Sequence, residues 1–168
     1  MYQNKILTIA FLGVLALSLL SSAYATKYTD PYTSTLEGKY NNKNGIFLLT
    51  GNSIFKGKQD AQIYLSGQLK EWNYYDSSIP NCKHAFSENT FLLFDKTKTH
   101  YAKLLISGKI CSANWSDTWK TFRGNYIIPE GKTLGTDQVS GKGIIEFTMN
   151  TKTGKTIGLL NGLITLTT

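Results

Sequence analysis

The sequence has few of the residues from which metal centres and nucleophilic sites are built. The 168-residue chain contains two cysteines and two histidines. His84 and His100 lack the spacing of paired metal ligands, and neither a C-x-x-C pair nor a G-x-S-x-G segment occurs. Such motifs hold a metal ion or present a nucleophile. We therefore predict no metal site and no cofactor, and we expect a non-enzymatic role in preference to an enzymatic one.

Arginine is also scarce, although the chain is basic. The formal net charge is +7 at pH 7, and Arg123 is the single arginine. Recognition of phosphate groups and guanine bases depends on the forked guanidinium group, and the lysines here are scattered along the chain. This pattern predicts a solvated basic surface and no nucleic-acid partner, although such charge also attracts acidic lipids and acidic glycans.

A long apolar run occurs only at the N-terminus. Lys5 precedes the apolar residues 6–20, and the triplet 23–25 reads Ala-Tyr-Ala. A run of this length is shorter than the roughly 20 residues of a membrane-spanning helix and fits a secretory signal peptide with an A-x-A cleavage site. We predict that residues 1–25 are removed after Ala25. The mature chain would then be secreted or periplasmic, without a membrane anchor.

The mature chain shows no sustained helical periodicity. Apolar and β-branched segments alternate with turn residues such as Asn44-Gly45 and the segment 150–154. Short strands at regular spacing are typical of a sandwich or barrel. We predict an extended N-terminal arm over residues 26–35 and one all-β domain, a single antiparallel β-barrel, over residues 36–168. The predicted strands cover residues 46–50, 61–66, 90–94, 101–107, 119–128, 141–149 and 156–167.

Glycines interrupt several of these strands. Gly67, Gly108 and Gly162 each stand between apolar positions in a similar local pattern. Glycine inside a strand loses packing, so its repeated use indicates a bulge, a barrel corner or a close approach of another chain segment. A phosphate-binding loop would require a helix after the glycines, whereas residues 144–149 have the character of a strand. We expect these glycines to let the strands curve.

The C-terminal third of the chain resembles the allene oxide cyclase-like barrel family. The resemblance rests on an aromatic and glycine pattern: Phe122, Gly124, Tyr126, Ile128, Gly131, Gly135, Gly141, Gly143, Ile145, Leu160, Gly162 and Ile164. The usual double glycine of the turn is replaced here by residues 129–132. The resemblance implies a barrel similar to bacterial secreted relatives of unknown role. The plant members cyclise an apolar substrate with a buried glutamate, but no motif here matches those positions, and no catalytic residue is carried over.

Cys82 and Cys111 are predicted to form a disulfide. In an oxidising compartment, two cysteines without a competing thiol pair with each other. A redox-active or metal-binding pair is the alternative, and it would normally show a C-x-x-C spacing.

We assign no catalytic residue, and Glu146 is the one candidate for a catalytic acid. It lies inside a predicted strand, and alternation places it on the face opposite to Ile145, Phe147 and Met149. If these three residues form the core, Glu146 is solvated. In a hollow barrel, it would instead face the cavity.

Aromatic residues cluster on either side of the predicted disulfide. If exposed, they would form an apolar platform for a sugar, a peptide or a partner protein, whereas the alternative is that they plug one end of the barrel. The candidate binding residues are Trp72, Tyr74, Tyr75, Trp115 and Trp119.

These features predict a secreted binding protein. Its partner would be a small apolar ligand inside the barrel, or a protein or glycan at the aromatic end. The first alternative is a cyclase or isomerase that acts on an apolar substrate in the barrel cavity. The second is a secreted inhibitor or adhesin that binds through its loops.

Overall fold

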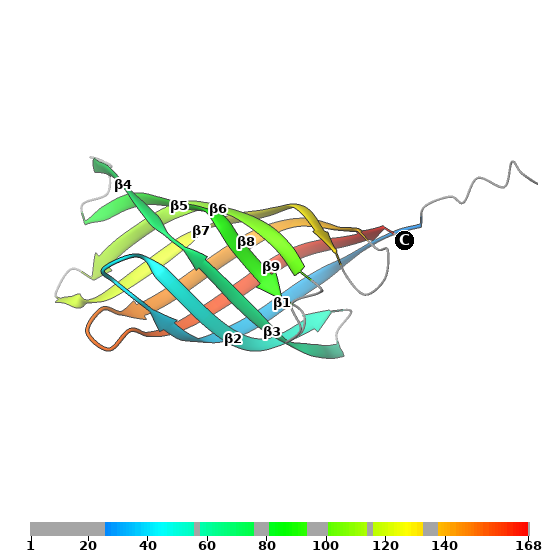
Figure 1. The fold of residues 1–168 in the computed structure, drawn as a ribbon, viewed down its shortest axis with the longest axis horizontal. Helices are drawn as coiled ribbons and strands as arrows, with labels where there is room; N and C mark the ends of the chain where they lie inside the picture. The colour runs from blue at the N-terminus through cyan, green and yellow to red at the C-terminus, as the bar shows by residue number, and fades with distance from the viewer. Residues whose placement is uncertain are drawn as a thin grey trace, which may run out of the picture.

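The protein is built of β-strands (Figure 1). The computed structural model describes residues 26–55, 58–75, 81–93, 101–113, 116–132 and 138–167. The strands in this part of the chain are β1 (Lys27–Tyr40), β2 (Ile46–Phe55), β3 (Lys58–Gln68), β4 (Lys70–Tyr75), β5 (Cys82–Leu93), β6 (Tyr101–Ala113), β7 (Ser116–Lys132), β8 (Gln138–Asn150) and β9 (Lys155–Thr167).

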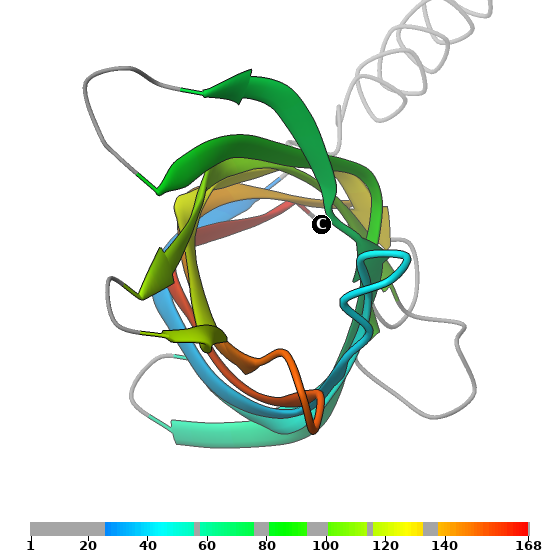
Figure 2. The ribbon, with the colours of Figure 1, turned by 90° about the vertical axis from the view of Figure 1, so that its left-hand side faces the viewer.

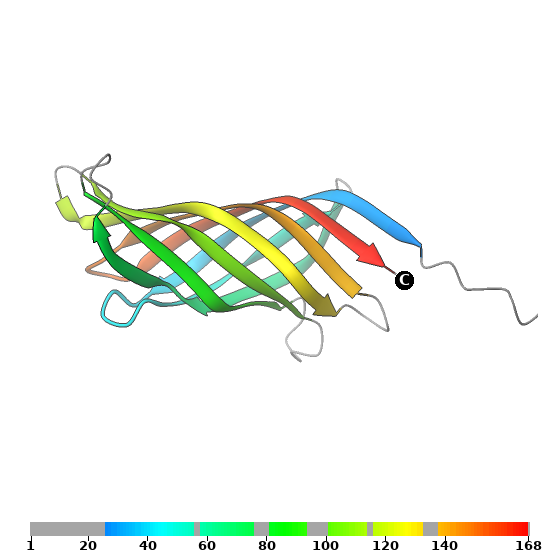
Figure 3. The ribbon, with the colours of Figure 1, turned by 90° about the horizontal axis from the view of Figure 1, so that it is seen from above.

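The strands form a closed antiparallel barrel. Their order is β3-β2-β1-β9-β8-β7-β6-β5-β4, and the pairing of β3 with β5 closes eight of them into a ring. Figure 2 looks into this ring from one end, and Figure 3 shows the strands tilted against the long axis. The strand β4 follows β3 after Leu69 and pairs with the first half of β5, where Glu71 lies opposite Ala85. The prediction of an all-β antiparallel barrel is confirmed.

The strands are longer than their local sequence patterns suggest. The segment Gly51-Asn52 has turn chemistry, yet it lies inside β2, because Gly51 is paired with Leu36 on one side and Ile63 on the other. The residues predicted as an N-terminal arm also belong to the sheet, since Lys27 already pairs with Thr167 of β9. Hydrogen bonding to neighbouring strands thus overrides local preferences at both places.

Two predicted turns are confirmed. Gly45 ends the β1–β2 turn with a φ angle of 72°, and Gly154 ends the β8–β9 turn with a φ angle of 75°. Residues with a side chain rarely adopt this left-handed conformation, so glycine is required there. The amide of Tyr40 donates a hydrogen bond to the carbonyl of Gly154 at 2.8 Å, which places the two turns next to each other.

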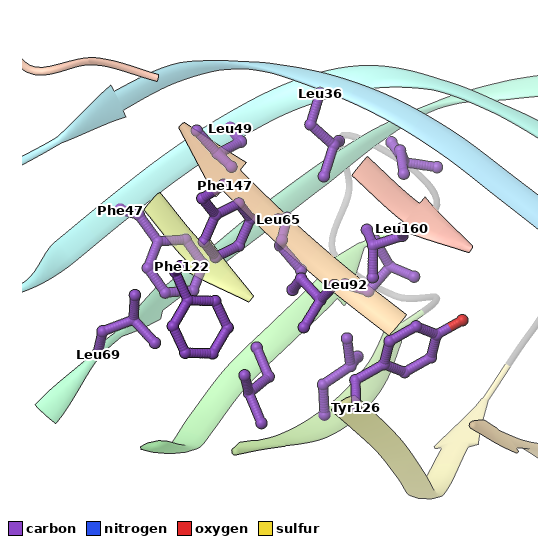
Figure 4. Close-up of a cluster of buried hydrophobic side chains, with 14 of the residues drawn as sticks. Leu36, Phe47, Leu49, Leu65, Leu69, Leu92, Phe122, Tyr126, Phe147 and Leu160 are labelled. Atoms are coloured by element: carbon purple, nitrogen blue, oxygen red, sulfur yellow. The ribbon is translucent and has the colours of Figure 1, made fainter. Parts of the chain in front are cut away.

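The interior of the barrel is apolar and rich in rings. The ring centres of Phe47 and Phe147 lie 5.2 Å apart, and those of Phe122 and Phe147 lie 5.8 Å apart. Figure 4 shows these rings in the interior together with leucines from several strands. The labelled buried residues are Leu36, Phe47, Leu49, Leu65, Leu69, Leu92, Phe122, Tyr126, Phe147 and Leu160.

Glycines make room for these rings. Tyr126 of β7 is paired with Gly143 of β8, which in turn is paired with Gly162 of β9. A Cβ atom added at Gly143 would lie 2.8 Å from Cε1 of Tyr126, and one at Gly162 would lie 2.6 Å from its hydroxyl oxygen. Close approach is therefore the role of glycine at these two positions, since large side chains must be matched by small ones in a narrow barrel.

The predicted disulfide is confirmed. Cys82 of β5 and Cys111 of β6 are direct partners across the two strands, with their Cα atoms 4.0 Å apart. The bond therefore joins two strands that are already paired.

Candidate binding site at the barrel mouth

A polar pocket lies at the end of the barrel that carries the β1–β2 and β8–β9 turns. We call this end the mouth, and it faces the viewer in Figure 2. The pocket has a volume of about 420 Å³, a size that suits a small molecule or part of a larger one. It is lined by Asn42, Glu71, Asn81, Lys83, Ile110, Ser112 and Lys120.

Glu71 is held between two lysines in this pocket. Lys83 Nζ donates a hydrogen bond to Glu71 Oε2 at 3.3 Å, and Lys120 Nζ donates one to Glu71 Oε1 at 3.1 Å. All three side chains are half-buried. One carboxylate thus faces two ammonium groups, so this cluster has an excess of positive charge.

The strand register brings the three residues together. Every second residue faces inward along β3 and through the connection to β4, where Gly67 and Leu69 are the last two residues of this series. Glu71 is the next residue in the series, and it pairs with Ala85. Lys83 lies two residues before Ala85 and therefore on the same face of β5. Lys120 lies two residues before the buried Phe122 in β7 and extends that inward series to the mouth.

The surroundings of the pocket shift the pKa of Glu71 and of the nearby Tyr40. Burial raises the pKa of the Glu71 carboxyl, but the hydrogen bonds and charges of Lys120 and Lys83 together outweigh this effect and hold its pKa below the ordinary value of 4.5. Burial, followed by the negative charge of Glu71, raises the pKa of Tyr40 to about 12. At neutral pH, the pocket therefore contains the Glu71 carboxylate as an acceptor, and the nearby phenol of Tyr40 is neutral.

Sequence reasoning missed this cluster, since residues 71, 83 and 120 are far apart in the chain and fit no motif. A signal was nevertheless present for two of them. Glu71 and Lys120 extend alternating inward series of apolar residues into positions where an apolar residue would be expected. For Lys83, the β5 segment before residue 90 was not predicted as a strand at all.

Glu146 lies on the outer face of the barrel. Its neighbours Ile145 and Phe147 are buried in the core, as expected for the solvated alternative. Glu146 pairs across β7 and β8 with Arg123, whose Nε lies 3.4 Å from Glu146 Oε1. From this face, Glu146 does not reach the inside of the barrel.

The strands place the aromatic candidates at the mouth, as far as they are described. Tyr75 of β4 pairs with Lys83, next to the disulfide, and β4 also contains Trp72 and Tyr74. The side chains of these three residues, and all of Trp115, lie outside the described part of the structure. Trp119 is 42% exposed and pairs with Asn150 beside the β8–β9 turn.

Other kinds of site are not seen in the described residues. There, no three His, Cys, Asp or Glu side chains form a group that could hold a metal ion. The described part of the chain likewise contains no helix that is long and apolar enough to cross a membrane.

The chemistry of the pocket suits a hydroxylated ligand. A hydroxyl group both donates and accepts hydrogen bonds. The pocket offers a carboxylate and amide oxygens as acceptors, and ammonium and amide groups as donors, with Ile110 as an apolar contact.

Comparison of the sequence with protein-family models finds no match, and neither does comparison with curated proteins or with solved structures.

Proposed function

We propose that this protein is a secreted, non-enzymatic binding protein that takes a sugar unit of a glycan into the mouth pocket. The observation that carries the proposal is the contrast between the two regions of the barrel. Apolar side chains from all around the ring pack the described interior, whereas the mouth contains a pocket of about 420 Å³ lined mainly by polar groups.

This contrast favours the mouth over the interior as the binding site. Leu36, Leu65, Leu104 and Ile145 have no solvent exposure, and their side chains belong to one continuous core. An apolar ligand in the interior would have to displace such side chains, and close-packed cores resist displacement. A cyclase in the interior would also need an acid there, and Glu146 lies on the outside.

Several features support the remaining parts of the proposal. The apolar N-terminal segment and the disulfide are typical of secreted proteins. Trp119 also lies at the mouth end, but next to the inward-facing Lys120 its exposed side chain is on the outer face of β7, so it does not line the pocket. Membership in the allene oxide cyclase-like family stays a prediction, although the barrel fold that it implies is present.

Amide chemical-shift mapping by NMR tests the proposal. The mature protein is titrated with a panel of neutral and acidic mono- and disaccharides. We expect at least one sugar to shift the amides of residues that line the pocket, such as Lys83, Ser112 and Lys120. If no sugar of the panel shifts these amides, or if the shifts map to another part of the barrel, the proposal is wrong.

A matched pair of variants makes the test specific. Ser112→Phe adds a ring to the lining of the pocket, whereas Ser107→Phe adds the same ring to the exposed outer face of the same strand. We expect Ser112→Phe to abolish the sugar-induced shifts and Ser107→Phe to retain them. Both spectra must show the dispersion of a folded β-protein. Equal binding by the two folded variants would contradict the proposed site.

A further inference from the structure

Exposed lysines continue the positive charge of the pocket over the neighbouring turns. Lys43 follows Asn42, a residue of the pocket lining, in the β1–β2 turn, and Lys152 lies in the β8–β9 turn. Lys39 and Lys155 end and begin the strands that lead to these turns. We call these four residues, Lys39, Lys43, Lys152 and Lys155, the lysine rim.

The lysine rim is one surface. The hydrogen bond from the amide of Tyr40 to the carbonyl of Gly154 ties the two turns together. Lys39 and Lys155 are direct partners across β1 and β9. Like charges directly opposite each other destabilise a sheet. All four side chains are exposed, and within the described part of the chain none of them forms an ion pair.

We propose that the glycan is a linear acidic oligosaccharide made of uronic acid units. This inference rests on the proposed function and names the class of its ligand. One unit occupies the pocket with its carboxylate beside Lys120, and its hydroxyl groups contact Asn42 and Ser112. The following units leave the pocket over Asn42 and run along the lysine rim, where their carboxylates face Lys43 and Lys152.

Charge and shape support an extended anion over a small neutral sugar. Around the mouth, the described side chains include six lysines, namely the lysine rim with Lys83 and Lys120, against Glu37 and Glu71. The rim leads away from the pocket over two adjacent turns, so that a ligand longer than one unit is needed to reach it. A nucleic acid also presents regularly spaced negative charges, but its recognition leans on arginine, and Arg123 lies on the outer face, paired with Glu146.

Isothermal titration calorimetry with tetragalacturonate tests the inference. The fully methyl-esterified tetrasaccharide is the matched control, because it keeps the same chain and ring hydroxyls but lacks the charges. We expect the acid to bind at least about tenfold more tightly than the ester at low salt, with an affinity that falls as salt rises. Equal affinity of acid and ester would overturn the inference.

Two double variants locate the contact. Lys43→Gln with Lys152→Gln removes two charges from the lysine rim, and Lys27→Gln with Lys142→Gln removes two exposed charges elsewhere on the barrel. We expect the rim variant to bind tetragalacturonate about tenfold more weakly and the control variant to bind it like the wild type. Equal effects of the two variants would contradict a role of the rim.

The outcomes separate this inference from the proposed function. If the methyl ester binds as tightly as the acid and Ser112→Phe abolishes binding, the mouth pocket is a sugar site and only the acidic class is wrong. If Ser112→Phe leaves the binding of both forms unchanged, the proposed site is wrong as well. A single-stranded DNA oligonucleotide that binds more tightly than tetragalacturonate, and more weakly to the rim variant, would assign the lysine rim to nucleic acid instead.

Discussion

The ring of Phe147 lies against Gly158, its direct partner on the neighbouring strand. A Cβ atom added at Gly158 would lie 2.9 Å from Cδ1 of Phe147. Further contacts of this added atom would be with Cε1 of Phe147 and with a methyl carbon of Leu49, so that side chains rather than backbone atoms fill the space. The glycine and the ring therefore act as a pair in the packing of the barrel.

Replacing Gly158 with alanine is expected to destabilise the protein. Because the added methyl group meets Phe147 at less than van der Waals distance, the free energy of unfolding should fall by about 1 to 3 kcal/mol. Urea unfolding followed by circular dichroism measures this change. Ile157→Ala, on the exposed face of the same strand, is the control, with an expected change within about 0.5 kcal/mol.

A second substitution tests whether the ring is the cause. Phe147→Leu in the Gly158→Ala background should restore part of the lost stability, since a leucine leaves the space beside residue 158. A double-mutant cycle should give a coupling energy of about 0.5 to 3 kcal/mol. Strict additivity of the two changes would show that the ring and the glycine do not depend on each other.

The disulfide is expected to contribute strongly to stability. Cys82 and Cys111 are separated by 29 positions, and the chain-entropy estimate for a loop of this size is about 3 to 4 kcal/mol. The variant with Cys82→Ser and Cys111→Ser should therefore unfold at a clearly lower urea concentration. Far-ultraviolet circular dichroism checks that the variant still folds. An unchanged midpoint would contradict this prediction, because it would mean that the unfolded chain gains no freedom when the bond is removed.

The fold could be predicted from the sequence because turn residues and the alternation of apolar with polar residues are local signals. Gly45 and Gly154 mark two turns with the backbone conformation that glycine permits, and the alternation around Phe147 gives the correct inward face of β8. The turn chemistry of Gly51 is misleading, because non-local pairing on both sides keeps this segment extended. Local propensity cannot report pairing with strands that are distant in sequence.

Much less of the candidate site than of the fold could be predicted from the sequence. The cluster of Glu71, Lys83 and Lys120 forms only because three different strands reach the mouth of the barrel. Its formation depends on the strand register and on the closure of the barrel. The aromatic clusters were visible in the sequence because they lie close to Cys82 and Cys111. The alternation rule was sufficient for Glu146 once its neighbours were known to be core residues.

Glu71 is expected to make the free energy of unfolding of the protein decrease at acidic pH. Its pKa is lowered in the folded state, so the unfolded state takes up the proton more readily as the pH falls. The stabilisation is therefore fully present above the ordinary pKa of 4.5 and is lost as the pH falls through the lower pKa of the folded state. At neutral pH, Glu71→Gln should lower the free energy of unfolding by about 1 kcal/mol.

Urea midpoints of the wild type and Glu71→Gln, measured from neutral to acidic pH, check this prediction. The difference between the two proteins should shrink as the solution is acidified, because the wild-type carboxyl becomes neutral. Glu146→Gln, which breaks the exposed ion pair with Arg123, should show a smaller difference throughout. A gap between wild type and Glu71→Gln that stays constant at acidic pH would contradict the role of the carboxylate charge.

The buried hydroxyl of Tyr126 leads to the last prediction. Tyr126 is 1% exposed, and its hydroxyl has no hydrogen-bond partner among the described residues. An unsatisfied buried polar group is costly, so Tyr126→Phe should leave the free energy of unfolding unchanged or raise it by about 1 kcal/mol.

Burial also raises the pKa of Tyr126 to about 12. The neutral phenol is thus favoured over the phenolate in the folded state, so the folded protein loses stability relative to Tyr126→Phe as the pH rises from the ordinary pKa of 10 toward 12.

Alkaline titration followed by ultraviolet difference absorbance measures the ionisation of the tyrosines. Tyr126→Phe should remove one group that titrates near pH 12 in the folded protein. Urea unfolding of the same variant gives the change in stability. A loss of more than about 1 kcal/mol in Tyr126→Phe would mean that its hydroxyl is hydrogen-bonded, for instance to a buried water molecule, because removing an unpaired group does not destabilise a core.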